Sequence, residues 1–242
     1  MLASRLIIAA ALSGAQALAQ AVPENSQAPA VEVERPQGFQ WGPAVWQSGF
    51  FVGIEHSFRL IQAKTRREFR GKFFEDYGRS VKNIHGWGDG DSPFTNYVAH
   101  PMQGGVAAFI QIQNDPAGIG QEFGRGGAYW RSRLKSMAWS AAYSTQFEIG
   151  PISEATIGNV GKQRGTSGYT DFVVTPIGGL GMAILEDAVD RFIVGRFESH
   201  RPGLGWQRFL RVALNPQRSL ANVLRLKWPW HRDTRQLAVG QS

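Results

Sequence analysis

The sequence predicts a mainly α fold: a compact bundle of amphipathic and apolar helices joined by long loops rich in glycine and proline. Apolar residues recur at spacings of three and four in several segments, which is the period of one face of a helix. Hydrophobic residues make up 43% of the 242 residues, and cysteine is absent. This composition allows a core and excludes a disordered chain, a collagen-like chain and a disulfide scaffold.

The first 21 residues have the three parts of a secretory signal peptide. Arg5 is basic, residues 6–12 are apolar, and residues 17–19 read Ala-Leu-Ala, a pattern that favours cleavage shortly after it. The apolar run is shorter than the roughly 20 residues that a membrane span needs. The sequence therefore predicts export to the periplasm or the outer membrane. Residues 22–38 lack periodicity and are expected to form a flexible leader.

A helical domain is expected over residues 39–200, with its first helix at 42–62. Large apolar residues form a row at spacings of four and three there, namely Trp46, Phe50, Ile54, Phe58 and Ile61. Glu55 and Arg59 lie off that row. Such a stripe faces either a protein core or a membrane surface, and the pattern favours the core. The charged residues 64–82 are predicted to continue this helix or to form a second one.

Two further helices are predicted at residues 101–113 and 131–147. Pro101 suits the first position of a helix, and the stretch 92–114 contains no charged side chain. The first of these helices is therefore expected to be buried. In the second, one side of the helix is expected to carry Leu134, Ala138, Ala141 and Thr145.

Residues 150–169 are broken by glycine and are expected to be irregular, with a short helix at 153–157. Residues 171–197 form the longest remaining apolar segment. Only Pro176 and the glycines at 178, 179 and 181 argue against one continuous helix over this segment. The same small residues would let another helix approach closely.

Known motifs for nucleotide, zinc and serine-hydrolase sites are absent from the sequence. Asp89-Gly90-Asp91 resembles the start of a calcium loop, but the twelfth position of that loop is His100 and not glutamate. We therefore expect no metal and no cofactor.

Polar residues inside the apolar segments form the candidate site. Asn96 precedes His100 by four residues, and Ser140, Ser144 and Glu148 share the same spacing, which places each set on one helical face. A buried carboxylate needs a partner, and an imidazole is a suitable one. The sequence predicts that three catalytic residues converge: His100, Glu148 and Asp171. Three polar residues are expected to support them: Asn96, Thr175 and Glu186.

Structural roles for the same three residues stay open beside this prediction. Asp171 suits a helix N-cap, Glu148 suits an exposed helix C-terminus, and His100 suits a hydrogen bond to a backbone carbonyl.

The motifs around these residues resemble a known family. They are Asn-Tyr-Val-Ala-His-Pro at 96–101, Gln-Phe-Glu at 146–148 followed by Ser153-Glu154, and Asp-Phe-Val-Val-Thr-Pro-Ile-Gly-Gly at 171–179. Together they resemble a bacterial envelope family called domain of unknown function 3943, and more distantly the VanZ-like helical membrane proteins. The resemblance spans residues 92–190 and implies a helical envelope protein without an established reaction. It adds Glu154 to the candidate residues and points again to His100, Glu148 and Asp171.

The net charge of +7 comes from the end of the chain. Residues 1–200 hold 18 basic and 18 acidic residues, whereas residues 201–242 hold eight basic residues and one acidic residue. We expect a basic aromatic tail that binds an anionic lipid or lipopolysaccharide surface. Its membrane-binding residues would be Arg211, Arg218, Arg225, Lys227, Trp228 and Trp230. Because an exported protein does not meet the chromosome, no nucleic-acid partner is expected, and the alternative is a tail whose aromatic residues fold back on the domain.

Two functions follow from these features. The first is an exported envelope protein with a structural or binding role at a membrane surface. The second is an envelope hydrolase or transferase that acts on a lipid or cell-wall substrate, with His100 as general base and Glu148 or Asp171 orienting it.

Overall fold

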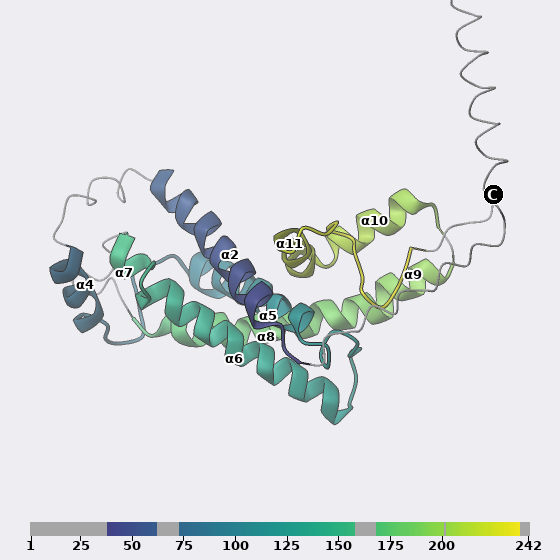
Figure 1. The fold of residues 1–242 in the computed structure, drawn as a ribbon, viewed down its shortest axis with the longest axis horizontal. Helices are drawn as coiled ribbons and strands as arrows, with labels where there is room; N and C mark the ends of the chain where they lie inside the picture. The colour runs from purple at the N-terminus through teal and green to yellow at the C-terminus, as the bar shows by residue number, and fades with distance from the viewer. Residues whose placement is uncertain (1–37, 62–72, 158–167, 201, 238–242) are drawn as a thin grey trace, which may run out of the picture. The chain divides into compact units, whose positions relative to one another are not determined.

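Helices make up the regular structure of this chain, as Figure 1 shows. The computed structural model describes residues 38–61, 73–157, 168–200 and 202–237, and no strand occurs within these ranges. The mainly α fold predicted from the sequence is confirmed. The expected signal peptide at 1–21 and nearly all of the expected leader at 22–38 lie outside the described residues.

The elements of the unit that begins at Pro36 are, in chain order, α2 (Trp41–Ile61), α4 (Phe73–Lys82), the π-helical η1 (Thr95–Ala99), α5 (His100–Asn114), α6 (Gly127–Ile149), α7 (Glu154–Ile157), α8 (Thr170–Val189), the π-helical η2 (Asp190–Val194), α9 (Gly195–Ser199), α10 (Leu204–Ala213) and α11 (Pro216–Leu224). Helices α5, α6 and α8 pack on one another, and α2 lies across α5 (Figure 1). Helices α4 and α7 lie together near one end, and α10 and α11 lie together toward the other.

Helix α5 forms the buried centre of this unit. It contacts α2, α6, α8 and α11, and 13 of its 15 residues are buried. The buried helix predicted at 101–113 is therefore present. It can be enclosed on all sides because it carries alanine, glycine and large apolar residues with only neutral amides between them.

Helices α5 and α8 cross with their backbones in direct contact. A Cβ atom on Gly104 would lie 2.0 Å from the carbonyl oxygen of Thr175, and one on Gly179 would lie 2.4 Å from the carbonyl carbon of Gly104. Side chains do not fit at such distances, so glycine is required at both positions. The small residues of the segment 171–197 do admit another helix, as their sequence predicts.

The same segment is one continuous helix, and Pro176 and the glycines near it do not interrupt it. Helix α8 includes Pro176 and continues through η2 and α9, because one proline removes only one backbone hydrogen bond. The combined segment, Thr170–Ser199, is long and apolar enough to cross a membrane by length and composition alone. The core helix of a soluble protein passes the same test.

Four of the five residues in the apolar row of α2 lie on the outside of the unit, and the fifth, Ile54, packs partly against the core. The exposed fractions are 71% for Trp46, 68% for Phe58 and 70% for Ile61, so the expectation that this stripe is core is wrong. The buried side of α2 carries Ala44, Gln47, Phe51, Val52 and His56.

Helix α6 is turned in the same way. Leu134 is 53% exposed, and Ala138 and Thr145 are exposed too, so the expected apolar face points outward. The residues that α6 buries include four serines, Ser132, Ser136, Ser140 and Ser144. The small serine side chains let α6 lie close to α5 and α8, and the same side of the helix buries Tyr143 and Phe147 in the core.

The last part of the chain is folded into the same unit and is not a tail. Helix α11 packs on α5, and Ala221, Asn222 and Leu224 are buried. The domain boundary expected at residue 200 is therefore corrected, because residues 202–237 belong with the helices that precede them.

Candidate functional site

Three residues predicted to converge do meet in the structure. His100 is the first residue of α5, Glu148 is the second-last residue of α6, and Asp171 is the second residue of α8. One ligand atom from each side chain lies within 4.8 Å of the others. His100 Nε2 and Asp171 Oδ1 are 3.4 Å apart. We call these three residues the His-Glu-Asp cluster.

A chain of hydrogen bonds fixes the ring of His100. Tyr143 donates to Glu55 Oε2 at 2.5 Å, and the amide of Gln103 donates to the same oxygen at 3.1 Å. Because the Gln103 nitrogen faces Glu55, its Oε1 is left to accept a hydrogen bond from His100 Nδ1, at 3.0 Å. The proton of a neutral His100 ring therefore sits on Nδ1, and the lone pair of Nε2 points toward Asp171.

The two carboxyl groups of the cluster have oxygens without hydrogen-bond partners. Glu148 Oε1 and Asp171 Oδ1 are both buried and accept no hydrogen bond. Burial, together with the neighbouring carboxylates, raises the pKa of Asp171 to about 7 and raises that of Glu148 well above its usual range. At neutral pH the cluster can thus hold and release protons, which is the property that acid–base chemistry requires.

The structural roles considered for these residues do not describe them. Asp171 is not the N-cap of α8, because that position belongs to Tyr169. His100 was considered for a hydrogen bond to a backbone carbonyl, but it bonds the side-chain amide of Gln103. Glu148 was considered for an exposed helix end, but its Oε1 is shielded from water.

Asn96 and Glu154 lie next to the cluster. Asn96 is buried in η1 and donates to Asp89 Oδ1 at 2.9 Å, and the negative charge of Asp89 contributes to the raised pKa of Asp171. Glu154, in α7, is buried and forms an ion pair with Arg59. Burial raises the pKa of Glu154 to about 7, although Arg59 opposes the shift.

Thr175 and Glu186 have different surroundings. Thr175 is fully buried one turn after Asp171, and its hydroxyl has no partner. Glu186 lies 15 residues after Asp171, which is about 22 Å along a helix. It accepts the backbone N–H groups of Gln217 and Arg218 at 2.7 and 3.0 Å. Glu186 therefore stabilises the first turn of α11 and does not join the cluster.

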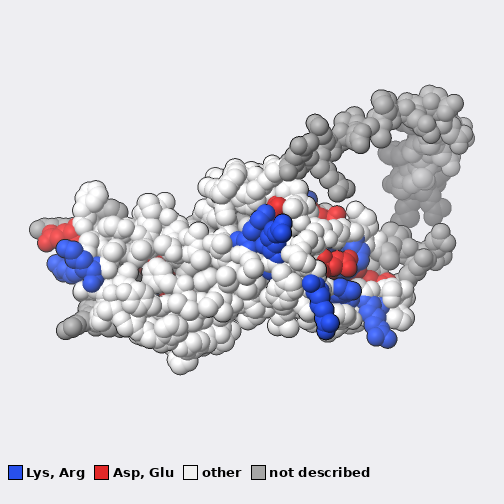
Figure 2. Space-filling model, turned by 90° about the horizontal axis from the view of Figure 1, so that it is seen from below, with Lys and Arg blue, Asp and Glu red and all other residues white. Residues whose placement is uncertain are grey.

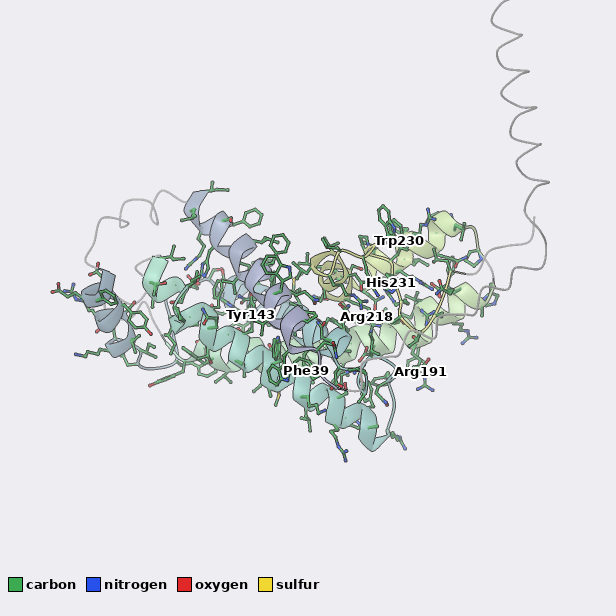
Figure 3. All side chains as sticks on the ribbon, in the orientation of Figure 1. Phe39, Tyr143, Arg191, Arg218, Trp230 and His231 are labelled. Carbon is green, nitrogen blue, oxygen red and sulfur yellow. The ribbon has the colours of Figure 1, made fainter. Side chains whose placement is uncertain are left out.

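Most of the basic residues expected to bind lipid are engaged inside the protein. Arg211 is 1% exposed, and its Nε and Nη2 atoms donate to Oε1 and Oε2 of Glu198 at 2.5 and 3.0 Å. Arg218 pairs with Asp187, and Arg225 pairs with Asp233 at 2.6 Å. Figure 3 shows Arg218 between α8 and the last segment of the chain. Assigning these arginines to a lipid surface is corrected, because their charges neutralise carboxylates of the same chain.

The end of this segment keeps some exposed groups. Lys227 is exposed and lies 3.2 Å from Asp233. Trp228 is 69% exposed and stacks on Trp230, with the ring centres 5.0 Å apart. Arg208 lies over the ring of Trp230 (Figure 3 labels this tryptophan).

Sequence reasoning missed Glu55, Arg59 and Tyr143. Glu55 and Arg59 were visible as the residues off the apolar row of the first helix, but that row was assigned to the core. Since the row points outward, Glu55 and Arg59 point inward. Tyr143 lies where α2 meets α6 (Figure 3), and no residue spacing indicated its bond to Glu55. Burial raises the pKa of Glu55 to about 7.

An apolar cavity of about 390 Å³ lies between α2 and α6, beside Tyr143. Its lining includes Val45, Val52, Trp139, Ala142 and Ile152. The members of the His-Glu-Asp cluster are not part of this lining. A catalytic role for the cluster also requires an open pocket around its three side chains, and that pocket stays a prediction.

Comparison with protein-family models, with curated proteins and with solved structures finds no match for this chain. The resemblance to an envelope family therefore stays a prediction based on the short motifs themselves.

Proposed function

We propose that this chain is an exported envelope protein that rests on a lipid membrane through the outward face of α2. The observation that carries the proposal is the row of large apolar side chains on that face, where Trp46, Phe58 and Ile61 are each about 70% exposed. A helix with an apolar face and few charges on that side partitions into the boundary between head groups and acyl chains. Tryptophan is the side chain most favoured at that depth.

The rest of the surface supports a lipid partner. Exposed apolar residues also occur on α6 and α8, including Leu134, Ile177 and Leu185. Figure 2 shows charged side chains at one end of the visible face and across its other half, with a stretch between them that is nearly free of charge. Soluble proteins rarely keep large exposed apolar surfaces unless a membrane or a partner covers them.

Binding is expected to depend mainly on apolar contact. The arginines of residues 202–237 are largely held in internal ion pairs, so little positive charge is left to attract anionic head groups. Added salt screens charge but leaves apolar burial in place. This expectation differs from that of a basic tail, whose binding would weaken strongly with salt.

Co-sedimentation with vesicles of phosphatidylethanolamine and phosphatidylglycerol tests the proposal. The full chain should sediment with the vesicles at both low and high salt. Combining Trp46→Gln with Phe50→Gln should weaken binding about tenfold, because two partly exposed aromatic side chains lose their burial in lipid. Phe74→Gln, on the charged helix α4, is the matched control and should bind as the unchanged chain does.

Two results would contradict this proposal. One is failure of the full chain to sediment with vesicles at any salt concentration. The other is a stable oligomer that buries the α2 face and leaves the chain in the supernatant, since the partner would then be a second copy.

A second candidate function is a hydrolase or transferase reaction at the His-Glu-Asp cluster. The fixed ring of His100, with its Nε2 lone pair facing Asp171, favours this candidate. Incubation with phospholipid and with cell-wall fragments, followed by mass spectrometry, tests it. Product should form with the unchanged chain and with Gly181→Ala, but not with His100→Gln; product formation that survives His100→Gln would contradict it.

A further inference from the structure

The His-Glu-Asp cluster presents three electron-pair donors to one another with no hydrogen donor between them. The Nε2 lone pair of His100 faces the cluster because its Nδ1 proton is bonded to Gln103. Asp171 Oδ1 and Glu148 Oε1 are buried and lack hydrogen-bond partners. Asp171 is 94% buried, being 6% exposed. Unpaired buried oxygens of this kind are costly unless a proton or a cation occupies the space between them.

The charge around the cluster also calls for a cation. Four acidic side chains gather in this region, namely Asp89, Glu148, Glu154 and Asp171, and the negative charges of the other three all act on Glu148. Arg59 is the cation that the described residues place against them, and it is already paired with Glu154. A divalent ion bound by Glu148 and Asp171 would offset this excess of negative charge.

We propose that His100, Glu148 and Asp171 form a binding site for a divalent first-row transition metal ion such as Zn²⁺ or Mn²⁺. This inference does not depend on either proposed function. It departs from the expectation of no metal, which rested on the absence of known sequence motifs.

The donor set decides the class of ion. One imidazole with two carboxylates suits zinc, manganese or iron, whereas calcium and magnesium prefer sites built from oxygen ligands alone. Tetrahedral zinc with bonds of about 2.0–2.2 Å brings its ligand atoms to roughly 3.4 Å from one another. His100 Nε2 and Asp171 Oδ1 already lie 3.4 Å apart. With three protein ligands, one position stays open for water or a substrate.

The surroundings of the three ligands resemble those of bound metal sites. A metal-binding histidine usually donates its second N–H to a fixed acceptor, which holds the ring in place. Gln103 takes that role for His100, and Glu55 in turn orients Gln103. The hydroxyl of Ser144 donates to the backbone carbonyl of Asp171 at 2.9 Å and holds the start of α8 against α6.

Metal content of the full chain tests the inference directly. The purified chain would be stripped with a chelator and dialysed, and then titrated separately with Zn²⁺, Mn²⁺ and Mg²⁺ by calorimetry. We expect one ion per chain, and the electron paramagnetic resonance spectrum of Mn²⁺ should change on binding. Binding of less than about a tenth of an equivalent of both ions would overturn the inference, as would equal affinity for Mg²⁺ and Mn²⁺.

Variants identify the ligands. His100→Gln and Asp171→Asn should each weaken binding by at least about 100-fold, which is the upper end of the loss caused by changing a residue that only supports a ligand. Glu186→Gln changes a buried carboxyl at the other end of α8 and should leave the affinity unchanged. Circular dichroism would show that each variant is folded. Retention of full affinity in both folded ligand variants would also overturn the inference.

Discussion

His100 and Asp171 are separated by 71 residues in the sequence, yet His100 Nε2 lies 3.4 Å from Asp171 Oδ1. Both groups are buried, so the interaction between them is weakly screened. In chelator, a substitution at one of these positions removes the contact that the other side chain makes. The effects of His100→Gln and Asp171→Asn on the free energy of unfolding should therefore not add.

A double-mutant cycle measured by denaturant unfolding checks this prediction. We expect a coupling free energy of about 1 kcal/mol between the two positions, within the range seen for residues in contact. Additivity within about 0.3 kcal/mol would mean that the two side chains do not interact.

The contact between α5 and α8 predicts opposite effects for two glycines on one helix. Gly179→Ala places a Cβ atom against the backbone of Gly104 and should lower the free energy of unfolding by about 1–3 kcal/mol through overpacking. Gly181→Ala meets open space and should raise it by up to about 1 kcal/mol, because alanine favours helix. Thermal or urea unfolding of both variants measures the difference, and equal effects would contradict the close crossing.

Buried carboxyl groups predict how stability depends on pH. Burial raises the pKa of Glu186 and of Glu55 to about 7 in the folded chain. A carboxyl whose folded pKa is raised contributes stability below its unfolded pKa, and that contribution is lost as pH rises through the folded pKa. The free energy of unfolding should therefore fall as pH rises from about 5 to 8.

The titration of His56 affects the pH dependence of stability only in the lower part of this pH range. Burial lowers the pKa of His56, which makes stability rise with pH only up to about 6.5. The decline between about pH 6.5 and 8 thus belongs to the carboxyl groups. Glu186→Gln should make that decline shallower in urea unfolding at a series of pH values, whereas a stability that rises over this interval would contradict the assignment.

Two arginines of the last segment are predicted to behave differently. Arg211 is buried and bonded to both carboxylate oxygens of Glu198, so Arg211→Ala leaves that buried carboxylate with Arg235 alone, on Oε2, and should cost about 3 kcal/mol. Arg208 is exposed over Trp230, and Arg208→Ala should change the free energy of unfolding by less than about 1 kcal/mol. Similar small losses in both variants would show that Arg211 is not part of the core.

Much of the helical fold and the centre of the site could be predicted from the sequence. The four-residue spacings of Ser140, Ser144 and Glu148 placed these side chains on one face of a helix, and that face is the one that meets α8. Polar residues in otherwise apolar segments are expensive to bury alone, so their convergence followed once the segments were expected to pack.

The direction in which the helices face could not be predicted in the same way. Periodicity distinguishes the two sides of a helix. The more apolar side can be assigned to the core only when the opposite side faces water. In α2 and α6 some large apolar side chains, such as Trp46 and Leu134, lie outside, whereas the buried sides combine others, such as Phe51 and Phe147, with small and polar residues. Assigning Trp46 to the core therefore also turned Glu55 and Arg59 to the wrong side.

The position of the basic segment depended on contacts between distant residues. Its excess of basic residues suggested an exposed tail, because the carboxylates that pair with them lie earlier in the sequence. Asp187, Asp190 and Glu198 lie on α8, η2 and α9, and they pair with arginines of residues 202–237 that are 13 to 45 residues away. Net charge counted by segment cannot reveal such pairing, which is set by the packing of α10 and α11.

Contact between the outward face of α2 and lipid is the central claim, and spin labelling measures it most directly. The chain contains no cysteine, so Trp46→Cys, Phe50→Cys and the control Phe74→Cys each give one labelling site. On addition of phosphatidylethanolamine and phosphatidylglycerol vesicles, labels at 46 and 50 should become more accessible to oxygen and less accessible to a water-soluble nickel chelate. The label at 74 should not change. Unchanged access of the nickel chelate to positions 46 and 50 in the presence of vesicles would contradict the claim.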